Sequence, residues 1–338
     1  MVTKIGLDLG YANITVSDTA AGIYREQSVA LIDKDSRRIV SVGLDAIEHA
    51  EEFSDRALLV RPFKNGLLFD RQITQSIVSK VIGSVPQGER LRCVIGIPSD
   101  LVSKQEKDIF NILADSGITE CYAVNRAAAA LIGAGGNPNQ SVISVNVGAS
   151  ATEIAIFHNG EVTYTSREMV GGEDFDKAVK HYIGEQGGVN LSLSVARAIK
   201  EQLGSVWHGK EEGSIDIEGT LALTGNSVKM TITSEDIVGV FEKPLYRLLM
   251  AVANAIKKIP LDQVESVFAN GIVLTGGGSM LHGLDLMMSK ILGVSVRQPS
   301  DPIDSVAKGL SLINARIPVR GKAVKKNVTN ILASYYKE

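Results

Sequence analysis

The chain has 338 residues, of which 44% are apolar and 22% charged, and its formal net charge is −3. These values are typical of a globular protein, and the length predicts two domains because it exceeds the usual size of one compact core. They give no electrostatic case for nucleic acid as a partner, and no segment approaches the ~18 uninterrupted apolar residues of a membrane-spanning helix.

The first half of the chain reads as a strand meander followed by alternating helices and strands. Strands are predicted over 4–9, 12–17 and near 28–32. Apolar residues at helical spacing predict a helix over 72–82, and the apolar run 92–97 predicts the next strand. Ser103, as the N-cap, and Glu106 form a capping-box pattern that predicts a helix over 103–116. An alanine-rich helix over 124–133 follows.

The second half repeats this scheme. Predicted strands over 142–147 and 152–157 lead to an Asn159-Gly160 hairpin turn, and a return strand covers 161–167. Amphipathic helices are predicted over 174–183 and 193–203, and further strands and turns between 214 and 232. A long helical region is predicted over 234–259, with a kink near Pro244.

The two cysteines, Cys93 and Cys121, each lie inside an apolar stretch. Buried free thiols in a reducing cytoplasm are expected more often for such residues than a disulfide or a metal pair. Strand-like sequence begins by residue 4, so we also expect no signal peptide. Both observations predict a cytoplasmic protein.

Glycine-rich turns end three of the apolar runs, within Lys4–Gly10, Val142–Gly148 and Ile272–Ser279. A glycine lets backbone N–H groups approach an anion closely, because no Cβ stands in the way. The first two segments are alike, as if one half had been duplicated. The sequence therefore predicts one nucleotide held in a cleft between two similar halves.

Five motifs follow one another along the chain: Gly6–Asn13, Val60–Gly66, Ile132–Gly135, Val170–Asp176 and Gly271–Gly283. They lie in the order found in the actin-like ATPase superfamily, and within it the sequence resembles the MreB family of bacterial cell-shape proteins. The resemblance runs from Lys4 to about Ile313, over nine tenths of the chain. It implies an α/β, actin-like two-lobed fold, in which duplicated ribonuclease-H-like domains enclose a nucleotide cleft. The expected parts are a first lobe at 1–138 with an insertion around 30–70, a second lobe at 139–313 with an insertion around 174–243, and a basic amphipathic tail at 314–338.

The resemblance implies roles for matching residues. The two hairpins would grip the phosphates of ATP, or of another purine nucleotide, through backbone amides. Asp8 would hold Mg²⁺ through water, although the same carboxylate could simply cap a turn. Lys200 and Glu201 would contact base and ribose, where such a pair is more often plain solvated surface. The expected nucleotide-binding residues are Gly10, Tyr11, Ala12, Asn13, Gly148, Ala149, Ser150, Ala151, Lys200, Glu201, Gly276, Gly277, Gly278 and Ser279.

The sequence also departs from the family pattern at the positions expected to support hydrolysis. Asn146 stands where relatives carry an acidic residue, and Asn125 and Arg126 stand where a glutamate orients the attacking water. An amide can still position water, but an arginine stays protonated and cannot act as a base. Tyr11 and Ile14 also replace hydroxyl-bearing threonines. We therefore expect nucleotide binding with weak or lost hydrolysis.

The resemblance implies a cytoskeletal protein that polymerises into filaments of identical subunits. One alternative is an active MreB-type ATPase filament in cell-shape control or organelle positioning. Others are a chaperone, for which only about 25 residues remain after Ile313, and a sugar kinase, which would need a catalytic aspartate such as Asp100.

The tail offers a route to a membrane or an adaptor protein. A helix is predicted over 322–338, because its apolar residues follow helical spacing and its first turn is rich in lysine. We expect this helix either to pack on its own lobe or to face a partner or the inner membrane. The loop 84–90, by contrast, has one aliphatic residue and two charges, and its insertion into lipid would be costly.

Overall fold

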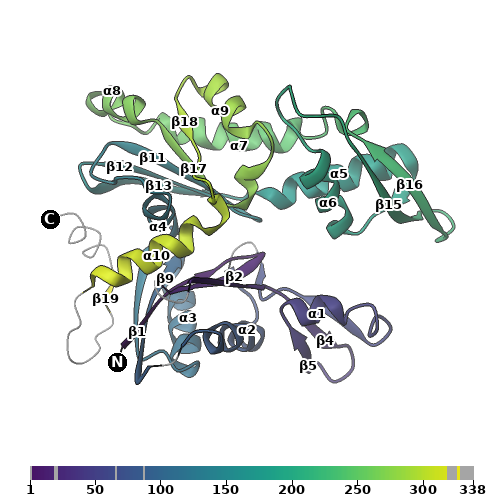
Figure 1. Cartoon of the computed structure of the whole chain (residues 1–338), viewed down its shortest axis with the longest axis horizontal. Helices are drawn as coiled ribbons and strands as arrows, with labels where there is room; N and C mark the ends of the chain where they lie inside the picture. The colour runs from purple at the N-terminus through teal and green to yellow at the C-terminus, as the bar shows by residue number, and fades with distance from the viewer. Residues whose placement is uncertain (1, 19–21, 65–66, 87, 318–325, 328–338) are drawn as a thin grey trace.

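The computed structural model describes residues 2–18, 22–64, 67–86, 88–317 and 326–327. Two mixed sheets stand on either side of a pair of central helices (Figure 1). The first sheet has the strand order β19-β10-β9-β1-β2-β3 and the second has the order β13-β12-β11-β17-β18. In each sheet a buried strand, β1 or β11, pairs antiparallel with the next strand along the chain and parallel with a later one.

The first sheet is covered on one face by two helices. Ile5, Leu7 and Leu9 point to this face, where they share a core with apolar residues of α2 and α3. The alternate residue Gly6 points to the opposite face, and a Cβ there would lie 2.5 Å from the backbone nitrogen of Ser311. The elements are β1 (Val2–Leu9), β2 (Asn13–Asp18), β3 (Gly22–Gln27), α2 (Arg71–Gly83), β9 (Arg90–Ile97), α3 (Ser103–Asp115), β10 (Glu120–Asn125) and β19 (Lys326–Asn327).

The second sheet is built in the same way. Ile143, Val145 and Val147 face a core shared with the helices on its outer side, and Ser144 points inward to donate a hydrogen bond to the Ala127 carbonyl at 2.8 Å. The elements are β11 (Val142–Val147), β12 (Thr152–His158), β13 (Glu161–Glu168), α5 (Gly172–Gly187), α6 (Leu193–Leu203), α7 (Glu242–Ile256), α8 (Leu261–Asn270), β17 (Ile272–Thr275), α9 (Leu284–Leu292) and β18 (Val296–Arg297).

Two small sheets are inserted at the outer ends of the halves, and both lie on the right in Figure 1. The first has the order β5-β4-β6 and the second the order β14-β15-β16. Their strands are β4 (Ala30–Asp33), β5 (Ile39–Val42), β6 (Ala57–Val60), β14 (Val189–Asn190), β15 (Ser214–Leu221) and β16 (Ser227–Thr233), with α1 (Leu44–Glu48) beside the first set. A short hairpin of β7 (Phe63–Lys64) and β8 (Leu67–Leu68) precedes α2.

Two helices, α4 (Arg126–Gly133) and α10 (Ser305–Arg316), fill the space between the large sheets. They cross at glycines. A Cβ on Gly133 would lie 1.7 Å from the Ser305 carbonyl oxygen, and one on Gly309 would lie 1.8 Å from that of Ala129. The two helix backbones are therefore in direct contact, with no layer of side chains between them.

The structure corrects three details of the sequence-based elements. Ser103 is the first residue of α3 rather than its N-cap, which is Val102. The helix predicted over 234–259 starts only at Glu242, after a 3₁₀ turn over Glu235–Ile237. Pro244 therefore lies in the first turn of α7, where a missing N–H costs no hydrogen bond and no kink is required.

The third correction concerns the tail. Lys326–Asn327 forms strand β19, which pairs parallel with β10, so the predicted helix is wrong at these two residues. The edge of β10 offers unpaired backbone groups, which an extended segment satisfies and a helix cannot. The rest of the predicted helix lies outside the described residues.

Candidate functional site

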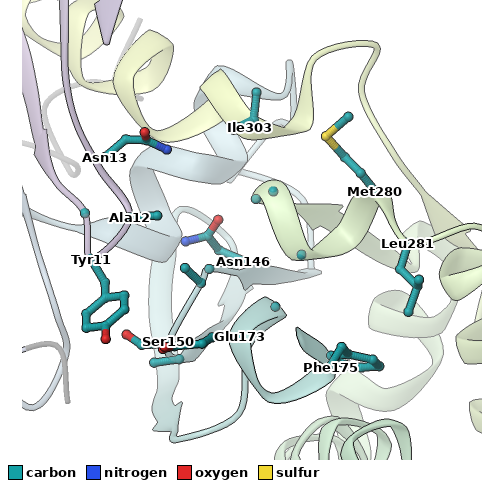
Figure 2. A pocket seen from close by; sticks show the side chains of 18 of the residues that line it. Tyr11, Ala12, Asn13, Asn146, Ser150, Glu173, Phe175, Met280, Leu281 and Ile303 are labelled. Carbon is teal, nitrogen blue, oxygen red and sulfur yellow. The ribbon is translucent and has the colours of Figure 1, made fainter. Parts of the chain in front are cut away.

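A cavity of about 410 Å³ opens between the two halves, at the ends of strands β1, β11 and β17. The three glycine-rich turns that follow these strands all contribute to its wall (Figure 2). Of the fourteen residues expected to bind nucleotide, thirteen line the cavity; Ser279 does not. The structure therefore brings together residues from three distant parts of the sequence.

The first two turns have the same construction. Leu9 pairs with Ile14 across the β1–β2 hairpin, and Val147 pairs with Thr152 across the β11–β12 hairpin, so each turn holds four residues. A Cβ on Gly10 would lie 2.5 Å from the Asn13 carbonyl oxygen. The N–H of Gly148 donates to the Ala151 carbonyl at 2.9 Å. Both turns are thus tight loops, and all their residues line the cavity.

The third turn closes the wall beyond β17. Gly276 has a φ of 85°, and a Cβ there would lie 2.4 Å from the Val147 carbonyl oxygen, so this position favours glycine on two counts. Gly277 is less crowded, because its nearest neighbours would be Ile303 side-chain atoms at 3.6 Å. Ser279 is 2% exposed and donates to the Gly276 carbonyl at 2.7 Å. Its side chain holds the turn together instead of facing a ligand.

Arg126, the first residue of α4, lies between the two hairpin turns. Its Nε lies 2.9 Å from Oδ1 of Asp8, and one terminal nitrogen lies 2.9 Å from Oε1 of Glu153. The other terminal nitrogen donates to the Leu9 carbonyl at 3.1 Å. Burial alone would lower the pKa of Arg126, but the two carboxylates outweigh burial and raise it. The guanidinium therefore keeps its charge and bridges the two halves.

The asparagines at the positions expected to support hydrolysis have structural partners. Asn125 is the N-cap of α4, and its Oδ1 accepts a hydrogen bond from the Ala128 N–H at 3.1 Å. It is not among the residues that line the cavity, whereas its neighbour Arg126 is. Asn146 does line the cavity, and its Oδ1 accepts a hydrogen bond from Thr275 at 3.3 Å.

The side chains present do not fit a divalent cation at Asp8. Mg²⁺ requires an octahedral shell of oxygen ligands and keeps several waters. Here one oxygen of Asp8 and one of Glu153 are paired with a cation already, and Asn146 supplies no charge. Among the residues that the structure describes, no cluster of three acidic, histidine or cysteine side chains forms a metal site.

A second charged cluster lines the same cavity. Asp176 on α5 is completely buried, and it pairs with Lys200 at 2.6 Å and Arg197 at 3.1 Å, both on α6. The Lys200 ammonium also donates to the Gly172 carbonyl at 3.2 Å. Lys200 is therefore a rigid part of the wall, while Glu201 lines the cavity from the exposed side of the same helix.

Besides the Arg126–Glu153 pair, three polar contacts join the halves around the cavity. Tyr11 reaches from the first turn toward Ser150 and Glu173 (Figure 2). Burial and then the nearby Glu173 carboxylate, to which it is hydrogen-bonded, raise the pKa of the Tyr11 phenol. Arg167 on β13 pairs with Asp100 at 3.0 Å, and Arg25 on β3 pairs with Asp304.

Sequence reasoning missed several of these residues. Glu153 is 3% exposed and lies in the buried strand β12. An acidic residue inside an apolar strand was a usable signal in the sequence, because a buried charge needs a partner. Glu173 and Asp176 lie inside the Val170–Asp176 motif but were not assigned a role. Arg25 and Arg167 lie in exposed-looking strands and gave no signal at all.

Comparison with known proteins assigns this chain to a family. The family model described as "MreB/Mbl protein" matches residues 2–320. The chain belongs to the MreB/Mbl family. The resemblance drawn from the motifs is thereby confirmed over nearly the whole sequence.

Curated relatives of this MreB/Mbl protein cover almost its full length. It is 28% identical to the cell shape-determining protein MreB of Escherichia coli K12 over 316 residues, which is 90% of this chain and 91% of the relative. It is 26% identical to the cell shape-determining protein Mbl of Bacillus subtilis 168, over 91% of this chain and 95% of the relative.

Solved structures confirm the actin-like fold of this MreB/Mbl protein. MreB5 of Spiroplasma citri bound to AMPPNP superposes with a TM-score of 0.87 and 21% identity, over 93% of this chain and 96% of that one. MamK in a double helical filament superposes with a TM-score of 0.79 and 20% identity, over 94% of this chain and 100% of that one.

Proposed function

We propose that this MreB/Mbl protein binds ATP or another purine nucleotide in the cavity between its halves and polymerises into filaments, with weak or no hydrolysis. The observation that carries the proposal is the convergence of three glycine-rich turns on one cavity of about 410 Å³. Backbone N–H groups from two facing turns suit a chain of phosphates, because its charge is spread over many oxygens. Structural neighbours bound to AMPPNP and to ADP support the same ligand class.

Weak hydrolysis is supported by the partners of the acidic side chains near the hairpin turns. A general base must accept a proton from the attacking water, which neither an asparagine amide nor an always protonated arginine can do. Asp8 and Glu153 are both paired with Arg126, and Asn146 carries no charge. Nucleotide would then act as a wedge that holds the halves in one arrangement. It would do so because it binds that arrangement more tightly than others, and no hydrolysis would be needed.

The test compares phosphate release by the wild type with that of a double variant, Arg126→Glu with Asn146→Asp. The structure selects Arg126 for this exchange, because Arg126 lines the cavity and Asn125 does not. We expect the double variant to release phosphate faster, provided that circular dichroism shows an intact fold. A wild type that already releases phosphate faster than the double variant would favour the active ATPase filament instead.

Filament assembly is supported by family membership and by the MamK double helical filament among the structural neighbours. A head-to-tail contact between identical subunits generates an open polymer when it does not close into a ring. If nucleotide acts only as a wedge, AMPPNP should support pelleting and filaments in electron microscopy as well as ATP does. A strict requirement for ATP would overturn the proposed role of nucleotide.

The proposed location is the cytoplasm, with the tail as the link to the inner membrane or to an adaptor. Within the described part of the chain, no helix has the length and apolar character needed to cross a bilayer. A variant truncated after Gly321 tests the tail: loss of vesicle or partner binding at an unchanged melting temperature supports the link, and a marked fall in melting temperature shows a packing role.

A further inference from the structure

Between the two hairpin turns, one arginine is held by two acidic side chains. Asp8 and Glu153 come from different halves and would repel each other and any phosphate placed beside them. Arg126 lies against both, with side chains 14% exposed for the arginine and 19% and 4% for the two carboxylates. Every nitrogen of its guanidinium has a described acceptor, because the remaining one donates to the Leu9 carbonyl.

A divalent cation would do two things at this place: neutralise the carboxylates and attract the phosphates. The guanidinium already offsets one of the two negative charges, and its charge is fixed to the chain. It also does the second, because a delocalised cation with several donors suits phosphate oxygens. A separate Mg²⁺ at Asp8 would have to approach a cation held 2.9 Å from the carboxylate oxygen, and like charges at such distances repel strongly.

We propose that Arg126 is a built-in counter-cation, so that this chain binds its nucleotide without a divalent metal. The inference rests on the proposed nucleotide site and adds to it a specific recognition of the metal-free polyphosphate. Arg126 would bridge Asp8 and Glu153 and present its charge to the phosphates held by the two turns.

The rest of the cavity wall is consistent with a metal-free polyanion. Six basic and five acidic side chains line it. Asn146, which faces the same space, adds no negative charge, and its amide oxygen is engaged by Thr275. The raised pKa of Arg126 is consistent with a guanidinium that stays charged beside the two carboxylates.

The test measures the dissociation constant of a fluorescent ATP analogue for the full chain, once with Mg²⁺ and once with EDTA. For the wild type we expect the two constants to agree within about threefold. Binding that weakens by more than about thirtyfold in EDTA would overturn the inference and leave the proposed nucleotide site standing. No binding in either buffer would overturn both.

Variants assign the effect to the guanidinium. Arg126→Ala should weaken binding in EDTA by at least about tenfold, and Mg²⁺ should restore much of it, because the two carboxylates are then free to share an ion. Arg126→Lys keeps the charge and should keep most of the affinity in EDTA. The matched control is Arg71→Ala, which removes an exposed arginine paired with Asp115 away from the cavity. Equal affinity of Arg126→Ala and wild type in EDTA would contradict the assignment, and the wild-type comparison stands even if the alanine variant does not fold.

Discussion

The three consecutive glycines after β17 differ in the space that surrounds them. Gly276 has a positive φ and a crowded Cβ position, and a Cβ on Gly278 would lie 2.6 Å from a Val147 methyl carbon. Gly277 has only Ile303 nearby, at 3.6 Å, and it lines the cavity. The same turn therefore has positions that the backbone reserves for glycine and one position with free space toward the cavity.

Gly277→Phe should fill the cavity without disturbing the fold. We expect nucleotide affinity to fall by at least about tenfold, while the melting temperature of the nucleotide-free protein stays within about 2 °C of wild type. Gly277→Ala is the control and should bind almost normally. Unchanged affinity in the phenylalanine variant would show that nucleotide does not occupy this part of the cavity.

The neighbouring residues Asn125 and Arg126 show how far a sequence can locate a site. The resemblance placed both at the start of the alanine-rich helix, and that placement is right. Adjacent helical residues point about 100° apart, so only one of them can face a given ligand. The capping preference of asparagine was the available signal that Asn125 would turn back onto the helix. The pairing of Arg126 with Asp8 and Glu153 could not be predicted, because it joins three separate segments.

The inserted sheet of β4, β5 and β6 is attached to the first half through Glu26, near the end of β3. Glu26 is 4% exposed and accepts hydrogen bonds from the Leu44 and Gln27 N–H groups at 2.6 and 2.9 Å. Lys80 on α2 pairs with it at 2.8 Å. Burial alone would raise the pKa of Glu26, but these hydrogen bonds outweigh it and lower it.

The lowered pKa makes this attachment sensitive to acid. The stability that Glu26 contributes is present above its usual pKa of 4.5 and is lost as the pH falls through its lower folded value. Glu26→Gln should cost about 1–3 kcal/mol at pH 7 and should flatten the fall in the free energy of unfolding between pH 5 and pH 3. The exposed Glu48→Gln on α1 is the control. Equal acid sensitivity of Glu26→Gln and wild type would contradict the assignment.

The crossing of α4 and α10 should tolerate no added atom. Gly133→Ala or Gly309→Ala places a methyl group less than 2 Å from a carbonyl oxygen of the other helix, and we expect a loss of about 3 kcal/mol or more in denaturant unfolding. Gly83→Ala, at the end of α2 with nothing within 4 Å, is the control and should be neutral or slightly stabilising. A small effect at the crossing would mean that the helices can separate.

Most elements were predictable because their signals are local. The helix Leu193–Leu203 was predicted with the bounds that the structure has, since Ser192 caps it and its apolar residues keep one face. Strand β3 was missed, because its exposed residues show no apolar face. The start of α7 and the strand at Lys326–Asn327 depend on tertiary contacts that a local pattern does not contain.

The two halves are held together around the cavity by the contacts of Tyr11 with Glu173, Arg167 with Asp100, and Arg25 with Asp304. The duplicated hairpins were enough to predict two halves and a cleft between them. They were not enough to predict these contacts, because each joins side chains whose own sequence surroundings are ordinary. These contacts are partly exposed to solvent; the Asp100 side chain, for example, is 52% exposed. Each contact alone therefore contributes little to the stability of the interface.

Removing two of these contacts should let the two halves separate more easily around the cavity. Tyr11→Phe combined with Asp100→Ala should raise the dissociation rate of bound nucleotide by about three- to tenfold, because the open arrangement becomes more populated. Stopped-flow displacement of a fluorescent ATP analogue measures this rate. Arg71→Ala, which removes an ion pair within the first half, serves as the control. A rate equal to wild type would mean that the remaining contacts, Arg25 with Asp304 and Arg126 with Glu153 among them, are enough to hold the halves in place.

The bare contact of α4 and α10 also determines how the molecule can move. Direct backbone contact at Gly133 and Gly309 leaves the helices no room to move closer together, so we expect the halves to move relative to each other by rotation about that point. The crossing is then a fulcrum. Arg126 lies at the start of α4, about 10 Å from the crossing at Gly133. The inserted sheets lie at the far ends of both halves (Figure 1). A shift of a few tenths of an ångström at the phosphates would thus be multiplied along these lever arms into a much larger displacement of the outer sheets.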